Sequence, residues 1–299
     1  MSLRASHLGE LAARSLSKKR EGVVTRVFRT SAYLRSGDDF VLILRGDLRS
    51  PITIDLQDGE VGRLFRVGDA WSFSPTALRS GKLEVSLAGA ELYRSALRRK
   101  SDVVLPSGKA LAKGVAMLSS LYDVSKSGPS LKEDRALREF VEGTLLPMAE
   151  GDEDAPYGSG RFLPLFGRGG GFTPAGDDFI AGFAATFNFV ARSRGARRVS
   201  IPKRLIMPRT VPESAATVAY AVLGYVDEGL ERLVLASVGG RDFRSELLEV
   251  ARRGHTSGID MSLGVLLCEA ALAEAEEEGS LDRCLDALWS RQGRTLIPS

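Results

Sequence analysis

Two adjacent carboxylates follow a cluster of glycines in the stretch FGRGGGFTPAGDDFIAGF at residues 166–183. Glycine destabilises the interior of a helix or strand, so glycines at this density indicate a backbone held close to a ligand or to another segment. Thr173 suits the N-cap of a helix, and Pro174 suits its first position, where the missing N–H group costs nothing. The stretch therefore predicts a glycine loop that leads directly into a helix.

Such a loop exposes backbone N–H groups at the positive end of a helix dipole, an arrangement that holds a phosphate or a carboxylate. It differs from an ATP-binding P-loop, because no Gly-Lys-Ser/Thr follows. It also differs from a dinucleotide-binding loop, because no buried strand leads into it. We therefore expect the loop to bind a small anionic substrate, such as a phosphate or a carboxylate.

Asp177 and Asp178 lie in the first turn of the expected helix. One interpretation is that they complement the helix dipole, an effect of ~0.3–1 kcal/mol. The other is that they bind a metal ion or a substrate cation beside the anion. We favour the second interpretation, because dipole complementation explains the acids but not the glycines. Adjacent helical residues point about 100° apart, so at most one of the two faces a given ligand.

A second stretch, GHTSGIDMSLGV at residues 254–265, repeats the glycines, threonine and aspartate of the first stretch when one residue of the first stretch is skipped in the alignment. A glycine four residues after an aspartate lies on the same helix face and leaves that face bare, so another backbone can pack there. We therefore expect the two helices to cross at their glycines and to present both aspartates to one pocket. The matches pair Gly254 with Gly171, Thr256 with Thr173, Gly258 with Gly176, Asp260 with Asp178, and Gly264 with Gly182.

His255 stands at the entrance of the second expected helix, where site membership and a structural role are equally open. Ser257 and Asp260 also fit a capping box, which needs no ligand. The other histidine, His7, is expected in an N-terminal helix. The candidate catalytic residues are Asp177, Asp178, His255 and Asp260; the candidate substrate-binding residues are Gly169, Gly170, Gly171, Thr173, Gly176, Thr256 and Ser257; the candidate metal ligands are Asp178 and Asp260, with Mg²⁺ as the ion considered.

The elements that position these residues fall into two parts. Strand-like segments at 23–28, 40–44, 52–56, 70–73 and 83–87 are separated by Gly/Asp/Ser clusters that are typical of hairpin turns. From residue 107 onward the apolar spacing becomes helical, with a long non-periodic piece at 149–171. The sequence therefore predicts an α+β protein: a small antiparallel β barrel or sandwich at residues 1–100, then a mainly helical domain at 101–299. The expected helices cover 109–121, 131–145, 174–192, 212–226, 229–237, 243–253, 258–277 and 281–289.

The composition narrows the class of protein. With 43% hydrophobic residues and a net charge of +3, the 299-residue chain is typical of a globular protein. No run is long enough for a membrane span and the first residues lack the apolar core of a signal peptide, so we expect a cytoplasmic location without membrane contact. Cys268 and Cys284 match neither a disulfide framework nor a zinc site. The basic runs lack interleaved aromatics, which disfavours nucleic-acid binding.

At GRGGGFTPAGDDFIAG the sequence resembles a family with a Gly-x-Gly-x-Gly-Leu-Thr-Pro-Ser-Gly-Asp-Asp signature. The stretch GHTSGIDMSLGV is similar to that family's Gly-His-Thr-Ser-Gly-x-Asp block, and the N-terminal VFRTSAYLRSGDDFVLIL and RSPITIDL resemble its opening strands. Here Phe172 replaces the usual leucine, and Ala175 replaces the usual serine, which removes one hydroxyl from the loop.

Members of that family from bacterial allantoin-degradation operons are described as a subunit of oxamate carbamoyltransferase, which works with two other subunit types. The resemblance implies an enzyme or enzyme subunit that takes part in carbamoyl transfer between carbamoyl phosphate and oxamate. Carbamoyl transfer requires orientation of the reactants and stabilisation of developing negative charge. In this picture the loop N–H groups and the Thr173 hydroxyl hold the anion, while Asp178 and Asp260 position a metal ion or an amide. The alternative is a non-catalytic ligand-binding or scaffolding subunit of a multi-protein complex.

Overall fold

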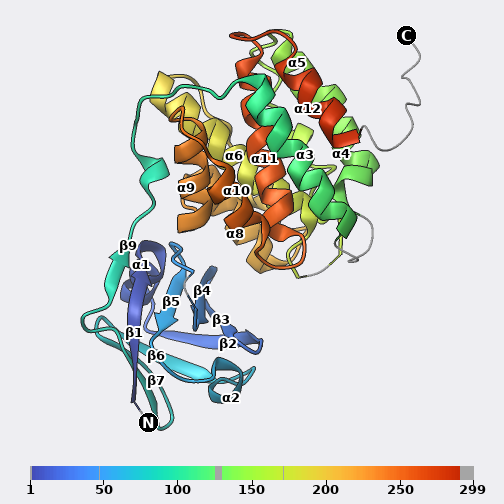
Figure 1. Cartoon of the computed structure of the whole chain (residues 1–299). Helices are drawn as coiled ribbons and strands as arrows, with labels where there is room; N and C mark the ends of the chain where they lie inside the picture. The colour runs from blue at the N-terminus through green and yellow to red at the C-terminus, as the bar shows by residue number, and fades with distance from the viewer. Residues whose placement is uncertain (1, 47, 125–129, 171, 290–299) are drawn as a thin grey trace. The chain divides into compact units, whose positions relative to one another are not determined.

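The structure is a computed structural model that describes residues 2–46, 48–124, 130–170 and 172–289. The chain forms two compact units (Figure 1). The first comprises Met1–Ala96 and Tyr225–Glu228, and the second comprises Leu97–Gly224 and Gly229–Ser299. The division into domains at 1–100 and 101–299 stays a prediction.

The first unit is a closed β barrel, which confirms the predicted fold class. Eight strands follow one another around it in the order β1-β5-β4-β3-β2-β6-β7-β8, and β8 pairs with β1 to close the ring, while β9 adds to the other side of β1. The strands are β1 (Ser2–Gly9), β2 (Glu21–Val27), β3 (Ser31–Ser36), β4 (Asp39–Leu44), β5 (Thr53–Leu56), β6 (Ala70–Ser74), β7 (Ala77–Ser80), β8 (Leu83–Ser86) and β9 (Glu91–Tyr93). The short helices α1 (Glu10–Lys18) and α2 (Val61–Leu64) lie between strands.

The barrel is mixed rather than purely antiparallel, because β1 pairs with β8 in parallel and β4 pairs with β5 in parallel. The prediction that His7 lies in a helix was wrong. His7 is in β1, where its register pairs it with Asp55 of β5 and with Glu91 of β9. Strand pairing with segments far along the chain overrides a local helical pattern here.

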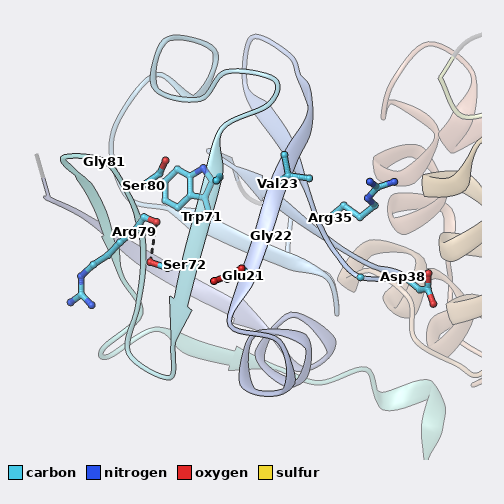
Figure 2. A pocket seen from close by; sticks show the side chains of 12 residues that line it. Glu21, Gly22, Val23, Arg35, Asp38, Trp71, Ser72, Arg79, Ser80 and Gly81 are labelled. Carbon is cyan, nitrogen blue, oxygen red and sulfur yellow. Dashed lines mark hydrogen bonds between the residues drawn. The ribbon is translucent and has the colours of Figure 1, made fainter.

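Alternate residues of the strands fill the barrel interior, as the two-residue period of a strand requires. Their side chains are buried, and Trp71 stacks on Phe65 with ring centroids 4.9 Å apart. The outer wall carries a hollow of 830 Å³ between β2, β3, β6 and β7, where the Ser72 hydroxyl donates to the Arg79 carbonyl (Figure 2). Neither glycine motif contributes to this hollow.

The second unit is helical (Figure 1). Its central helices, α6 and α11, pack against each other; α3 packs on α11, and α8 packs on α6. A π-helical turn, Val141–Leu145, joins α4 and α5. The helices are α3 (Gly108–Val124), α4 (Arg135–Phe140), α5 (Leu146–Ala149), α6 (Ala175–Arg194), α7 (Lys203–Ile206), α8 (Pro212–Val222), α9 (Glu228–Ser237), α10 (Arg244–Ala251), α11 (Ser257–Ala273) and α12 (Ser280–Trp289).

Helix α6 is buried from Ala175 to Ala191, on every face rather than on one stripe. Such a helix is typical of the centre of a helical unit. Among the described residues, no helix has both the length and the apolar character needed to cross a membrane. Cys268 and Cys284 are buried free thiols.

Candidate functional site

Helices α6 and α11 cross at Gly182 and Gly264. A Cβ atom on Gly182 would lie 2.0 Å from the carbonyl oxygen of Met261, and a Cβ atom on Gly264 would lie 2.1 Å from the carbonyl oxygen of Phe179. No other residue type fits at these distances, so each glycine is required by the backbone of the opposite helix. This confirms the expectation that the two motifs bring their helices together at the glycines.

The two helices run in parallel, with both N-termini at the same end. At that end the hydroxyl oxygens of Thr173 and Ser257 are 2.7 Å apart. At the far end, residues from the C-terminal parts of both helices line one cavity. The first turns of α6 and α11 therefore meet, as the internal repeat predicts.

Asp178 and Asp260 form a buried acid pair beneath these hydroxyls, with 3% and 0% of their surface exposed. Asp178 accepts hydrogen bonds from the side chains of Ser257 and Thr173. Asp260 accepts from the side chain of Thr256, and its Oδ1 accepts from the Tyr122 hydroxyl. One oxygen of each carboxyl, Oδ2 in both, has no hydrogen-bond partner among the described residues.

Burial raises the pKa of both carboxyl groups. The pKa of Asp178 rises well above its usual range, because burial and the nearby Asp260 outweigh the hydrogen bonds from Ser257 and Thr173. Burial raises the pKa of Asp260 to about 7, against the opposing hydrogen bonds from Tyr122 and Thr256. Burial therefore favours the protonated form of both carboxyl groups, and a protonated carboxyl can donate as well as accept hydrogen bonds.

Tyr122 is the member of this site that the sequence analysis missed. It lies on the buried face of α3 with Leu111, Val115 and Leu118, at helical spacing. This spacing was the signal in the sequence that could have indicated Tyr122, because a tyrosine on the buried face of a helix needs a polar partner for its hydroxyl. The partner's identity, Asp260, is 138 residues away in the chain and could not be read from the spacing.

Asp177 points to different surroundings from its neighbour. Its Oδ1 accepts from the backbone N–H of Gly167 at 2.9 Å, and its Oδ2 accepts from the hydroxyls of Ser214, at 2.6 Å, and Thr210. These contacts tie the start of the glycine loop to α8 and to the segment before it. The divergence of adjacent helical residues accounts for the difference, and the geometry indicates that Asp177 holds the loop.

The glycine loop itself differs from the expected anion cradle. Three N–H groups in the first turn of α6 are already used: Gly176 donates to the Arg168 carbonyl, and Asp177 and Asp178 donate to the Pro174 carbonyl. Helix α6 begins at Ala175 with Pro174 as its N-cap, one residue later than predicted, and the Thr173 hydroxyl contacts Ser257 instead of capping the helix.

The loop glycines have separate structural reasons. Gly167 and Gly169 have positive φ values of 73° and 89°. Gly170 does not have a positive φ, and no atom lies within 4 Å of a Cβ atom placed there. Gly176 packs on the backbone, since a Cβ there would lie 1.9 Å from the Leu165 carbonyl oxygen. Gly171 lies outside the described residues.

The second motif has the same close packing at Gly258, where a Cβ would lie 1.9 Å from the Val250 carbonyl oxygen. Its capping box does not form: Thr256 is the N-cap of α11, and Ser257 turns to Thr173 and Asp178. His255 is exposed in the preceding turn, and no contact of its ring with the acid pair is observed. Within the described segments, no group of three or more His, Cys, Asp or Glu side chains is arranged to hold a metal ion.

The match to a known family covers this site. Residues 165–269 match the family model of the oxamate carbamoyltransferase subunit AllH. The matched range, roughly a third of the chain, begins in the glycine loop and ends in α11, so it includes both motifs and both members of the acid pair. It excludes Tyr122, which reaches the pair from α3. Neither the curated proteins nor the solved structures include a match to this chain.

Proposed function

We propose that the chain is a subunit of an oxamate carbamoyltransferase and that its acid pair binds the amide end of a small substrate. The observation that carries the proposal is the pair of buried oxygens, Asp178 Oδ2 and Asp260 Oδ2, without partners among the described residues. A buried acceptor without a donor costs about 1–3 kcal/mol. An amide group has N–H donors and a carbonyl acceptor, so it can meet both an ionised and a protonated carboxyl oxygen.

The anionic end of the substrate belongs outside the pair, because two buried acids repel a phosphate or carboxylate. The exposed glycines Gly169 and Gly170 lie just before α6, and open space surrounds Gly170. Binding of an anion at this loop stays a prediction, and so do the substrate contacts of Thr173, Thr256 and Ser257.

In the transfer, the amide nitrogen of oxamate attacks the carbamoyl carbon of carbamoyl phosphate. The new C–N bond forms, the C–O bond to phosphate breaks, and phosphate leaves with the bonding electrons. The nitrogen gives up one proton, and the ionised form of Asp260 is suited to accept it, since burial raises the pKa of this carboxyl to about 7. Orientation of the two reactants is the other requirement of this reaction.

The donor set does not by itself fit a resident metal ion. The pair offers two buried carboxyl groups, and no third ligand accompanies them among the described residues. Mg²⁺ also binds through one or two carboxylates together with substrate oxygens, so its binding stays a prediction that titration tests. No step of the transfer is derived through a metal.

Asp178→Asn tests the proposal, because asparagine keeps the size of the side chain and removes the acid. In the complex reconstituted with its other subunits, carbamoyl transfer is measured as phosphate release with oxamate as acceptor. We expect transfer to fall at least a hundredfold while the melting temperature stays level or rises, since a buried acid is no longer strained. The melting temperature is also measured with and without Mg²⁺ and oxamate.

Asp282→Asn is the matched control, since Asp282 is an exposed acid in the first turn of α12. Asp282→Asn should change neither the rate of carbamoyl transfer nor the melting temperature. The alternative is a non-catalytic ligand-binding or scaffolding subunit, which the burial of the acid pair favours. Normal transfer by the Asp178→Asn complex would establish that alternative and remove the catalytic role of the pair.

A further inference from the structure

The helical unit contains a second hollow, remote from the acid pair. It has a volume of 590 Å³ and lies between the segment 148–157 and the C-terminal parts of α6 and α11. Ala191 on its wall is thirteen residues after Asp178, about 20 Å along the helix axis. The volume is within the usual range of small-molecule sites, about 300–1,000 Å³. The cavity is therefore a candidate binding site that is separate from the site of the proposed function.

The floor of this cavity is apolar. Phe187 and Val190 of α6 face Leu272 of α11 across it. Alanines at positions 191, 271 and 275 take up little of the space between the helices, where larger side chains would fill it. Protein interiors are normally packed without such gaps, so an apolar hollow that opens to solvent at one side calls for an apolar guest.

The rim carries both charges. Asp152, Glu153 and Asp154 lie on the loop side, while Arg194 and Arg197 lie at and just beyond the end of α6. The Arg197 guanidinium sits 4.2 Å from the centre of the Tyr157 ring and 3.4 Å from Asp154 Oδ1. The guanidinium of Arg197 therefore lies over the Tyr157 ring and also pairs with an acid of the loop side.

A charged ligand can displace the ion pairs at the rim of the cavity. In the Arg197–Asp154 pair the two side chains are 66% and 89% exposed. Arg194 is paired in the same way with Glu276, at 2.8 Å, and both are exposed as well. Exposed pairs contribute about 0–1 kcal/mol, so a ligand that brings its own two charges can exchange with them at little cost.

We propose that this cavity binds a small apolar zwitterion, namely a free α-amino acid with an aromatic or long aliphatic side chain. The side chain enters between Phe187 and Leu272, the ammonium group meets Asp152 and Asp154, and the carboxylate meets Arg194 and Arg197. A carboxylate pairs well with arginine, whose planar guanidinium offers parallel N–H donors. The inference does not rest on the proposed carbamoyl transfer.

Isothermal titration calorimetry of the full chain tests this proposal with L-phenylalanine and three analogues, each of which lacks one feature of L-phenylalanine. L-phenylalanine carries the apolar body and both charges, phenethylamine lacks the carboxylate, 3-phenylpropanoate lacks the ammonium, and glycine lacks the apolar body. We expect L-phenylalanine to bind and the other three to bind at least tenfold more weakly. Equal affinity for either singly charged analogue, or no heat from L-phenylalanine at millimolar concentration, overturns the proposal.

Two variants locate the binding. Ala275→Trp fills the cavity from its exposed edge and should weaken L-phenylalanine binding at least tenfold, while Ala116→Trp, at an exposed position of α3, should leave it unchanged. Asp154→Asn should weaken phenethylamine more than 3-phenylpropanoate, and Arg197→Gln should do the reverse. Unaltered binding to Ala275→Trp, with circular dichroism showing a folded protein, places the ligand elsewhere and overturns the proposal.

Discussion

Gly182 and Gly264 occupy equivalent places in two crossing helices, and each lies against the backbone one residue after the aspartate of the other motif. The contacts run from Gly182 to Met261 and from Gly264 to Phe179. This reciprocal packing brings Asp178 and Asp260 close enough for the charge of Asp260 to raise the pKa of Asp178. The acid pair is therefore a consequence of the glycine crossing.

Replacing either glycine at the crossing by alanine should force α6 and α11 apart. We expect Gly182→Ala and Gly264→Ala each to lower the free energy of unfolding by at least ~1–3 kcal/mol, the usual range for overpacking. Denaturant titration measures the loss, and Gly170→Ala is the control, since nothing lies within 4 Å of a Cβ there. If Gly182→Ala and Gly264→Ala were as stable as Gly170→Ala, the close packing of the two helices at these glycines would be contradicted.

Asp260 should make the protein less stable as the pH rises. Its pKa is about 7 in the folded chain against 3.8 unfolded, so between these values the folded state binds more protons and stability falls with increasing pH. The contribution is on the order of 4 kcal/mol across that interval. Relative to the parent, Asp260→Asn should have a flatter stability curve from about pH 4 to pH 7. Parallel curves for the two proteins would show that burial does not raise this pKa.

Glu269 should act in the same direction over a slightly higher range. It is buried in α11, its Oε1 accepts from the Ser237 hydroxyl at 2.5 Å, and burial raises its pKa from 4.5 to about 8. Glu269→Gln should therefore flatten the decline in stability up to about pH 8, without changing ligand binding at the acid pair. Unfolding at closely spaced pH values separates this contribution from that of Asp260; a variant whose curve still declines like the parent's would disprove it.

Asp177 should act on the loop more than on chemistry. Asp177→Ala leaves the Gly167 N–H and two hydroxyls without their acceptor, which should cost about 1–3 kcal/mol or more. Hydrogen exchange in residues 165–170 should speed up in this variant and not in Asp178→Asn. If exchange in the loop stays slow while carbamoyl transfer by the reconstituted complex is lost, Asp177 is catalytic, as the sequence analysis predicted.

Tyr122 should control the protonation of Asp260. Its hydroxyl donates to Asp260 and lowers the pKa of that carboxyl, so Tyr122→Phe should move the titration of Asp260 to higher pH. Carbon NMR of labelled aspartate measures the titration directly. Asp178 is the internal reference, because Tyr122 makes its hydrogen bond to Asp260, and an Asp260 titration that does not move would remove the role assigned to Tyr122.

The local pattern of the sequence determined the parts that depend on near neighbours. Helical spacing located the long helices within a few residues, and the repeated Gly-x-Asp-x-x-x-Gly spacing predicted that α6 and α11 cross at Gly182 and Gly264 with their aspartates together. Both inferences work because a helix places residues three and four apart on one face, whatever surrounds it. The fold class followed from the change in periodicity near residue 107.

Only the tertiary structure decided which partners those residues meet. β1 is a strand because β5, β8 and β9 pair with it, and its own residues suggested a helix. Tyr122 joins the acid pair from a helix 138 residues before Asp260, and Asp177 turns away to Thr210 and Ser214. The capping box does not form because the Ser257 hydroxyl hydrogen-bonds the Thr173 hydroxyl of the other motif instead. Hydrogen bonds and burial depend on distances between segments far apart in the chain, and those distances exist only once the core has packed.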